Sequence, residues 1–280
     1  MEMGETMNDS MKPIGVFDSG IGGLTAVKEL LELLPQEDIV YFGDTARVPY
    51  GTRSHETIVR YARQDLRLLL SKDIKAVLVA CGTVSSHALE ELQRMTDIPV
   101  MGVIDASVRT AMQQCRNGRI AVLATAATIN SHAYASAIHA IAPELEVVEK
   151  ACPLFVPLIE NGYADQNNPV TRMVAADYLS DLIRFDPDTV ILGCTHYPII
   201  KAIIHSFLPK AYLVESGKEA ARELTACLSS SGMVSTAKEK GRLTFYLSEE
   251  TESFSQVGEL FLGQPIYGKI CKESADHYQP

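Results

Sequence analysis

Two stretches of the chain share one pattern, an apolar run that ends at a cysteine: Val77-Leu78-Val79-Ala80-Cys81-Gly82-Thr83 and Val190-Ile191-Leu192-Gly193-Cys194-Thr195-His196. Short apolar runs of this kind are typical of buried strands in a parallel sheet. The two cysteines are 113 residues apart, and Ile120-Ala121-Val122 repeats Ile14-Gly15-Val16 at an offset of 106. The near-constant offset predicts two related halves, each with a cysteine where a strand ends.

Outward from these stretches, apolar runs alternate with segments that have the apolar spacing of a helix. The runs predict strands at Ile14–Phe17, Ile39–Phe42, Ala76–Ala80, Pro99–Val103, Ile120–Leu123, Val147–Ala151, Thr189–Leu192, Ala211–Val214 and Leu243–Leu247. The segments between them predict helices at Thr25–Leu34, Ser54–Ser71, Val84–Met95, Ser131–Ile141, Thr171–Arg184, Lys201–Phe207, Gly217–Leu228 and Phe254–Leu262. Such alternation is typical of α/β proteins. We predict two pseudo-symmetric parallel-sheet α/β domains with the active site in the cleft between them.

The composition excludes several classes of function. The chain has 280 residues, with 25 Lys and Arg against 35 Asp and Glu, and its net charge of −10 argues against binding to nucleic acid or to an anionic membrane. Residues Ile120–Pro143 carry no formal charge, but their Thr, Asn, Ser and His favour a strand, a loop and a helix over a membrane span. Because Met1–Ser10 lacks the layout of a secretory signal, we expect a cytoplasmic protein.

The six cysteines are far apart and include no C-x-x-C pair, so we expect reduced thiols and no disulfide framework. Ligands of open α/β sheets gather where strands end, and a cleft between two such halves would hold both Cys81 and Cys194. A thiol is an acid and its thiolate a base, with a reference pKa of ~8.5. Two of them on opposite faces of a carbon atom could remove a proton from one side and return one on the other.

Two other sites are weaker hypotheses. A zinc site could use Cys194 and His196, but no second pair of ligands is evident. The Gly20-Ile21-Gly22-Gly23 loop could bind a phosphate, but Thr25 stands where the dinucleotide motif has its third Gly, and Asp18 would repel an anion. The loop suits a small carboxylate better, at the N-terminus of the helix that follows. His196 could stabilise a thiolate at Cys194.

Several motifs together resemble the glutamate racemase family over about residues 13–265: Asp18-Ser-Gly-Ile-Gly-Gly-Leu24, Gly43-Asp44-Thr45, Pro49-Tyr50-Gly51, Cys81-x-Thr83, Ser131-x-x-Tyr134 and Gly193-Cys194-Thr195-His196-Tyr197-Pro198. The resemblance implies an enzyme that needs neither cofactor nor metal and interconverts L- and D-glutamate, the D form feeding peptidoglycan. It also implies a homodimer. The chain is then divided into an extension at 1–11, a first domain at 12–105 plus 215–280, and a second domain at 106–214.

The resemblance also implies roles for single residues. Cys81 matches the thiol that acts on the D-glutamate face, assisted by Asp18, and Cys194 matches the thiol of the L face, assisted by His196 with Glu160 near it. The residues that match the substrate-binding shell are Ser19, Pro49, Tyr50, Gly51, Gly82, Thr83, Thr125, Thr128 and Thr195.

One residue departs from the family pattern. The family has Cys-Asn-Thr where this chain has Cys81-Gly82-Thr83, and the lost side-chain hydrogen bond would weaken substrate binding by ~1.5–3 kcal/mol. We therefore expect the Gly82→Asn variant to gain affinity or rate. The same departure leaves two alternatives open, a related aspartate racemase and a ligand-binding relative without activity.

Overall fold

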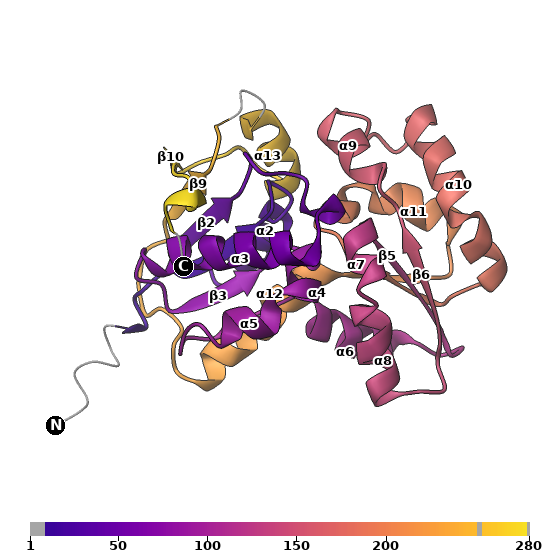
Figure 1. The fold of residues 1–280 in the computed structure, drawn as a ribbon, viewed down its shortest axis with the longest axis horizontal. Helices are drawn as coiled ribbons and strands as arrows, with labels where there is room; N and C mark the ends of the chain where they lie inside the picture. The colour runs from indigo at the N-terminus through magenta and orange to yellow at the C-terminus, as the bar shows by residue number, and fades with distance from the viewer. Residues whose placement is uncertain (1–8, 251–253, 279–280) are drawn as a thin grey trace.

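The computed structural model describes residues 9–250 and 254–278, which form two parallel sheets flanked by helices (Figure 1). The first sheet has the order β10-β9-β2-β1-β3-β4, with strands β1 (Ile14–Asp18), β2 (Ile39–Gly43), β3 (Ala76–Val79), β4 (Val100–Met101), β9 (Leu243–Leu247) and β10 (Lys269–Lys272). The second has the order β6-β5-β7-β8, with strands β5 (Arg119–Ala124), β6 (Glu146–Ala151), β7 (Thr189–Leu192) and β8 (Tyr212–Glu215). We call the parts built on these sheets the first half and the second half.

The helices connect the strands and cover the sheets. The α-helices are α2 (Leu24–Leu33), α3 (His55–Leu70), α4 (Gly82–His87), α5 (Leu89–Gln93), α6 (Ile104–Gln114), α7 (Ala126–Asn130), α8 (Ala133–Ile141), α9 (Phe155–Glu160), α10 (Pro169–Phe185), α11 (Lys201–Phe207), α12 (Ser216–Ser230) and α13 (Phe254–Leu262). Short 3₁₀ helices are η1 (Tyr50–Thr52), η2 (Tyr197–Ile200) and η3 (Ala275–His277). None of the described helices is long and apolar enough to span a bilayer.

The repeat seen in the sequence has a counterpart in the strand pairing. In the first half β1 lies between β2 and β3, with Val16 opposite Leu78. In the second half β5 lies between β6 and β7, with Val122 opposite Ile191. The strand before each cysteine, β3 or β7, therefore pairs with the first strand of its half, β1 or β5. The predicted fold class, two parallel-sheet α/β units, is confirmed.

The core extends through both halves. Neighbouring residues of a strand face opposite sides of the sheet, so Val16 and Phe17, both fully buried, pack into different apolar clusters. The cluster that contains Val16 also contains Leu123 and Leu192 of the second half. Between the halves, α12 packs against both α2 and α6. One of the apolar clusters therefore spans both halves, and this packing joins the two sheets in addition to the chain connections.

Some elements differ from the sequence prediction. The helix expected at Val84–Met95 is two helices, α4 and α5, because the backbone leaves helical geometry at Ala88. The helices α6, α7 and α9 and the strand β10 were not predicted. Helix α7 lies in a Thr-rich segment and α9 contains Pro157, so local propensity disfavours both. The half-exposed edge strand β10 lacks the apolar run of a buried strand.

The N-terminal extension expected at residues 1–11 falls mainly outside the described residues. Its last part belongs to the fold, because Ser10 is buried and its carbonyl accepts a hydrogen bond of 2.6 Å from Lys75 Nζ. The same ammonium is paired with the buried Glu37 carboxylate at 2.5 Å. The chain is therefore anchored from residue 10 onwards, two residues before the predicted start of the first domain at residue 12.

Candidate active site

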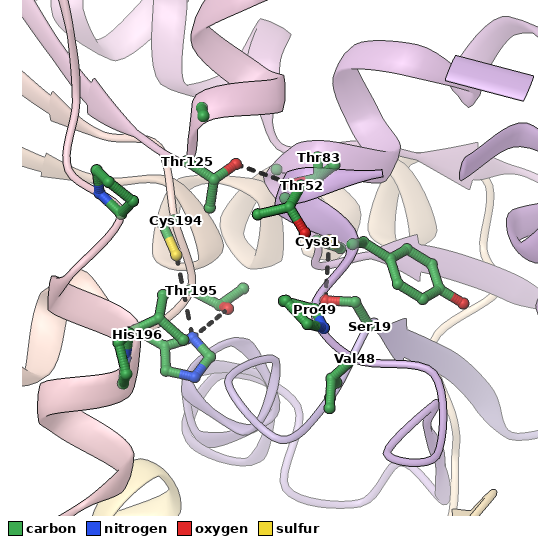
Figure 2. Close-up of a pocket in the computed structure, with 18 of the residues that line it drawn as sticks. Ser19, Val48, Pro49, Thr52, Cys81, Thr83, Thr125, Cys194, Thr195 and His196 are labelled. Carbon is green, nitrogen blue, oxygen red and sulfur yellow. Dashed lines mark hydrogen bonds between the residues drawn. The ribbon is translucent and has the colours of Figure 1, made fainter. Parts of the chain in front are cut away.

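Both predicted cysteines open on one cavity of about 350 Å³ between the halves. Cys81 follows β3 by two residues and Cys194 follows β7 by two residues, so the two thiols occupy equivalent places at the ends of their strands. Cys81 is also the residue directly before α4, and its backbone is extended. Its side chain therefore lies beyond the end of the strand. Figure 2 shows the two thiols approaching the cavity from opposite walls.

Most residues that the sequence singled out lie around this cavity. Its walls include Ser19, Pro49, Tyr50, Gly51, Cys81, Gly82, Thr83, Thr125, Glu160, Cys194, Thr195 and His196. Asp18 and Thr128 lie behind the wall, at 1% and 0% exposure. The sequence analysis missed the other wall residues, which are small or apolar and carry no chemical signal: Gly20, Val48, Thr52, Ala126, Pro153, Val156, Pro157 and Gly193.

The side chains around the Cys81 thiol are a carboxyl group and a hydroxyl group, and none of them is a cation. Its thiol donates a hydrogen bond of 3.5 Å to Ser19 Oγ, and the carboxylate of Asp18 lies behind it. Burial, together with the charge of Asp18, raises the pKa of Cys81 to about 12. Burial also raises the pKa of Asp18 itself, although Asp18 Oδ2 accepts a hydrogen bond of 3.2 Å from the Gly20 N–H. Cys81 is therefore a protonated thiol at neutral pH.

The surroundings of Cys194 are cationic. His196 Nδ1 lies 4.0 Å from Cys194 Sγ and 3.3 Å from Thr195 Oγ1, and His196 Nε2 lies 2.8 Å from Glu160 Oε1 (Figure 2). Burial opposes a charge on this imidazole, but its hydrogen bonds to Cys194 and Glu160 raise the pKa of His196 to about 10. An imidazolium at this place stabilises negative charge on the Cys194 sulfur.

Three threonine hydroxyls from both halves meet at the cavity, those of Thr83 and Thr125 in its wall and that of Thr128 behind it. Thr83 Oγ1 of the first half lies 3.0 Å from Thr125 Oγ1 and 3.3 Å from Thr128 Oγ1, both of the second half. Thr125 and Thr128 are themselves 3.0 Å apart. Three hydroxyls hold three protons and can donate to one another or to a bound anion, so this cluster is a polar binding surface without a formal charge.

In the described part of the chain, no third ligand stands with Cys194 and His196 to complete a zinc site. Within residues 9–250 and 254–278, no group of three or more His, Cys, Asp or Glu side chains is placed to hold a metal ion. The glycine loop at Gly20–Gly23 also has a structural use, because Gly22 packs against Thr195 and His196 of the second half.

Comparison with known proteins gives a consistent result. The sequence profile described as Asp/Glu/Hydantoin racemase matches residues 14–224. The chain belongs to this racemase family. It is 48% identical over 253 residues to a glutamate racemase of Geobacter metallireducens, covering 90% of this chain and 93% of the relative. A glutamate racemase of Chlorobaculum tepidum is 45% identical over 92% of this chain and 94% of its own.

Solved structures of the family share the fold. The structure of glutamate racemase from Francisella tularensis, in complex with D-glutamate, superposes with a TM-score of 0.90 at 41% identity and covers 96% of this chain and 100% of that chain. The resemblance to the glutamate racemases in the sequence is thus supported over nearly the whole chain.

Behind the cavity, a buried charged network holds the loop that carries Tyr50. The Tyr50 hydroxyl contacts Asp44 Oδ2 and lies 3.0 Å from Asp65 Oδ2. Arg47 joins the two carboxylates, with Nε 2.5 Å from Asp44 Oδ2 and Nη2 2.8 Å from Asp65 Oδ1. The hydroxyl of Tyr50 is therefore engaged behind the wall. The sequence analysis missed this network, although Asp65 falls on the apolar face of α3 beside Leu66 and so carries a signal.

The structure corrects the expectation for Gly82→Asn. A Cβ atom at position 82 would lie well under 3.0 Å from the Gly193 carbonyl oxygen, a distance that real Cβ atoms do not adopt. The obstacle is backbone and cannot rotate away. An Asn at position 82 would therefore require the backbone at Gly82 or at Gly193 to shift before its side chain could reach a substrate.

Proposed function

We propose that the protein is a glutamate racemase that interconverts L- and D-glutamate by proton transfer between two thiols. The observation that carries the proposal is the pair Cys81 and Cys194, which come from equivalent places in the two halves and open on one cavity. The named relatives at 41–48% identity are glutamate racemases, and one of them was solved with D-glutamate.

The unequal surroundings of the two thiols support one assignment of the first step. With L-glutamate bound, the Cys194 sulfur, which lies beside the His196 cation, takes the proton from the α carbon. The electron pair of that C–H bond stays on the α carbon. Cys81, whose pKa of about 12 keeps it protonated, then donates its proton to the opposite face of the carbon. D-glutamate reacts through the reverse sequence, with Cys81 as the base and Cys194 as the acid.

The α proton is far less acidic than a thiol, so the site must stabilise the negative charge that develops on the substrate. Fixed dipoles aimed at that charge are the usual means. We propose that the hydroxyls of Ser19, Thr83, Thr125 and Thr195 bind the polar groups of the substrate, with Thr128 supporting two of them from behind. Val48, Val156 and Pro157 supply an apolar wall against which the methylene groups can pack.

Further parts of the proposal follow the family resemblance. We propose that the proton transfer requires no cofactor, because the two thiols together supply both transfer groups. We also propose the domain division 12–105 plus 215–280 and 106–214, a homodimer, a cytoplasmic location and a role in supplying D-glutamate for peptidoglycan. Sedimentation of the purified protein would test the dimer.

The direct test is exchange of the α proton in D₂O, with reduced protein and each enantiomer of glutamate and aspartate in separate samples. We expect loss of the α-proton NMR signal and of optical rotation with both glutamates and not with the aspartates. Exchange with the aspartates alone would replace glutamate as the substrate, and no exchange with any of the four would overturn the racemase proposal.

A further inference from the structure

The imidazole of His196 is enclosed by groups from both halves of the molecule. In the second half, Glu160 Oε1 lies 2.8 Å from its Nε2 and Cys194 Sγ lies 4.0 Å from its Nδ1. The first half supplies Phe261 of α13, whose ring centroid lies 4.9 Å from that of His196. Only 6% of His196 and 1% of Phe261 are exposed. Helix α13 of the first half therefore contacts the cation that lies beside the Cys194 thiol.

The two hydrogen-bonding partners alone do not fix the orientation of the His196 ring. Both meet the ring at its edge, so the ring stays free to rotate about the line that joins them. The planes of the His196 and Phe261 rings meet at 78°, an edge-to-face contact of the kind that aromatic pairs prefer. A flat ring packed in this way opposes that rotation. The contact with Phe261 therefore supplies the restraint that the hydrogen bonds lack.

Phe261 is held firmly by the rest of the first half. Helix α13 packs against α2, and at the other end of α13 the ring of Phe254 makes an edge-to-face contact with Phe245 of β9, with centroids 5.7 Å apart. Phe261 itself does not line the cavity, whereas His196, Glu160 and Cys194 do. Any effect of Phe261 on a bound substrate must therefore act through a residue that lines the cavity.

We propose that Phe261 is a positioning residue for His196. Its ring holds the imidazole in the orientation in which one nitrogen faces the Cys194 sulfur and the other faces Glu160. The consequence for catalysis rests on the proposed racemase function, in which His196 assists Cys194 and not Cys81. Loss of the Phe261 ring should then weaken proton transfer at Cys194 and leave transfer at Cys81 unchanged. The restraint on the imidazole itself does not depend on the reaction.

The matched control for Phe261→Leu is Phe254→Leu. Both phenylalanines belong to α13, both make an edge-to-face contact, and they are 1% and 2% exposed. The two variants remove the same atoms from the same helix, so a general loss of stability should be similar in both. A difference between them measures what Phe261 does at His196.

The first readout is the ratio of α-proton exchange without inversion to racemisation, measured for each enantiomer of glutamate in D₂O. With D-glutamate, Cys81 removes the proton and Cys194 must deliver the next one, so a weakened Cys194 returns more molecules to the D form. Because misplacing reacting groups by about 1 Å costs on the order of 100-fold, a tilted imidazole should raise this ratio by about fivefold in Phe261→Leu.

The ratio should not rise with L-glutamate, because the thiol that then completes inversion is Cys81. It should stay at the wild-type value with both enantiomers in Phe254→Leu. A ratio does not depend on the fraction of the protein that is folded, so a merely structural role of Phe261 would leave it unchanged.

The second readout needs no turnover. The Cε1 hydrogen of a histidine exchanges slowly with D₂O, and mass spectrometry follows it in tryptic peptide 185–201, which contains His196 and no other histidine. A loosened ring meets water more often. In the substrate-free protein we therefore expect this exchange to be about fivefold faster in Phe261→Leu and unchanged in Phe254→Leu.

An unchanged exchange rate at His196 in Phe261→Leu would overturn the proposal, as would an equal change in Phe254→Leu or an unchanged ratio with D-glutamate. If the wild-type protein exchanges neither enantiomer of glutamate, the racemase function fails, and exchange at His196 still decides whether Phe261 restrains the imidazole. If Phe261→Leu does not fold, Phe261→Met and Phe254→Met make the same comparison, because methionine fills more of the space of the lost ring and is not flat.

Discussion

The two sides of the cavity have the same backbone plan and opposite electrostatics. Each places a cysteine two residues after a buried strand, but Cys81 faces Asp18 and Ser19, whereas Cys194 faces His196, which is paired with Glu160. The first environment raises the pKa of its thiol to about 12, and the second supplies a cation. Two related halves have thus become one acid and one base, which is what proton transfer across a carbon atom requires.

The largest effects should come from removing either thiol. Cys81→Ser and Cys194→Ser should each lower racemisation by about 10³-fold or more, because a serine hydroxyl is a far weaker acid than a thiol and is not ionised at neutral pH, so it can neither take nor return the α proton readily. Serine is close in size to cysteine, so both variants should keep the fold. Circular dichroism would check this.

The same variants also test which thiol serves which face. With Cys194 intact, Cys81→Ser should still exchange the α proton of L-glutamate for deuterium without inversion, and Cys194→Ser should do so with D-glutamate. Proton NMR of each enantiomer in D₂O measures this. The reverse pattern would exchange the assignments of the two thiols, and wild-type racemisation in either variant would contradict the two-thiol mechanism.

An intermediate effect should follow from Glu160→Gln, which removes the charged partner of His196 and keeps a hydrogen-bonding side chain. The pKa of His196 is raised to about 10 in part by Glu160, so the imidazolium is present below that pH and is lost as pH rises through it. Without Glu160 the pKa should fall, and the basic limb of the pH profile of kcat/KM should move to lower pH. At neutral pH the loss should be smaller than for either cysteine.

A pH profile of Glu160→Gln beside wild type measures this shift. Because L- and D-glutamate are equally stable, kcat/KM must change equally in both directions, which provides an internal check on the data. An unchanged basic limb would show that His196 does not set it.

The sequence predicted the two thiols and the side chains that assist them because most of these residues lie in or beside short motifs at strand ends. Cys81, Cys194 and His196 were found in this way, and Glu160 was found through the family resemblance. What the sequence could not show is contact between segments far apart in the chain. Gly82 is the clearest example, since its close approach to the Gly193 carbonyl, 111 residues away in the chain, is visible only in the structure.

The fold was predicted well where apolar periodicity was strong, and less well where it was not. Strands such as β3 and β7 are buried at every position and were found almost to the residue. The helices α7 and α9 are each a single turn or little more, and tertiary contacts stabilise them against their own propensity. The Asp44–Arg47–Asp65 network was missed because periodicity identifies the buried face of α3 and not the partner of a charge on it.

The smallest effect should come from Asp65→Asn, which tests whether the buried carboxyl group of Asp65 is uncharged. Burial and the neighbouring charge of Asp44 raise the pKa of Asp65 well above its usual value, which favours the protonated side chain. Asparagine has nearly the same shape and can still accept from Arg47 and contact Tyr50. We therefore expect a change in unfolding free energy within about 1 kcal/mol at neutral pH, and kcat/KM near wild type.

The pH dependence makes this prediction sharper. A carboxyl whose pKa is higher in the folded than in the unfolded protein binds more protons when folded, so its contribution to stability falls as pH rises between the two values. Asp65→Asn has no such group, so its stability relative to wild type should increase with pH over that range. Urea unfolding at several pH values measures it, with Asp65→Leu as a control that loses both hydrogen bonds. If Asp65→Asn instead lost stability relative to wild type as pH rose, Asp65 would be ionised, and the charge of Arg47 would outweigh burial and Asp44 together.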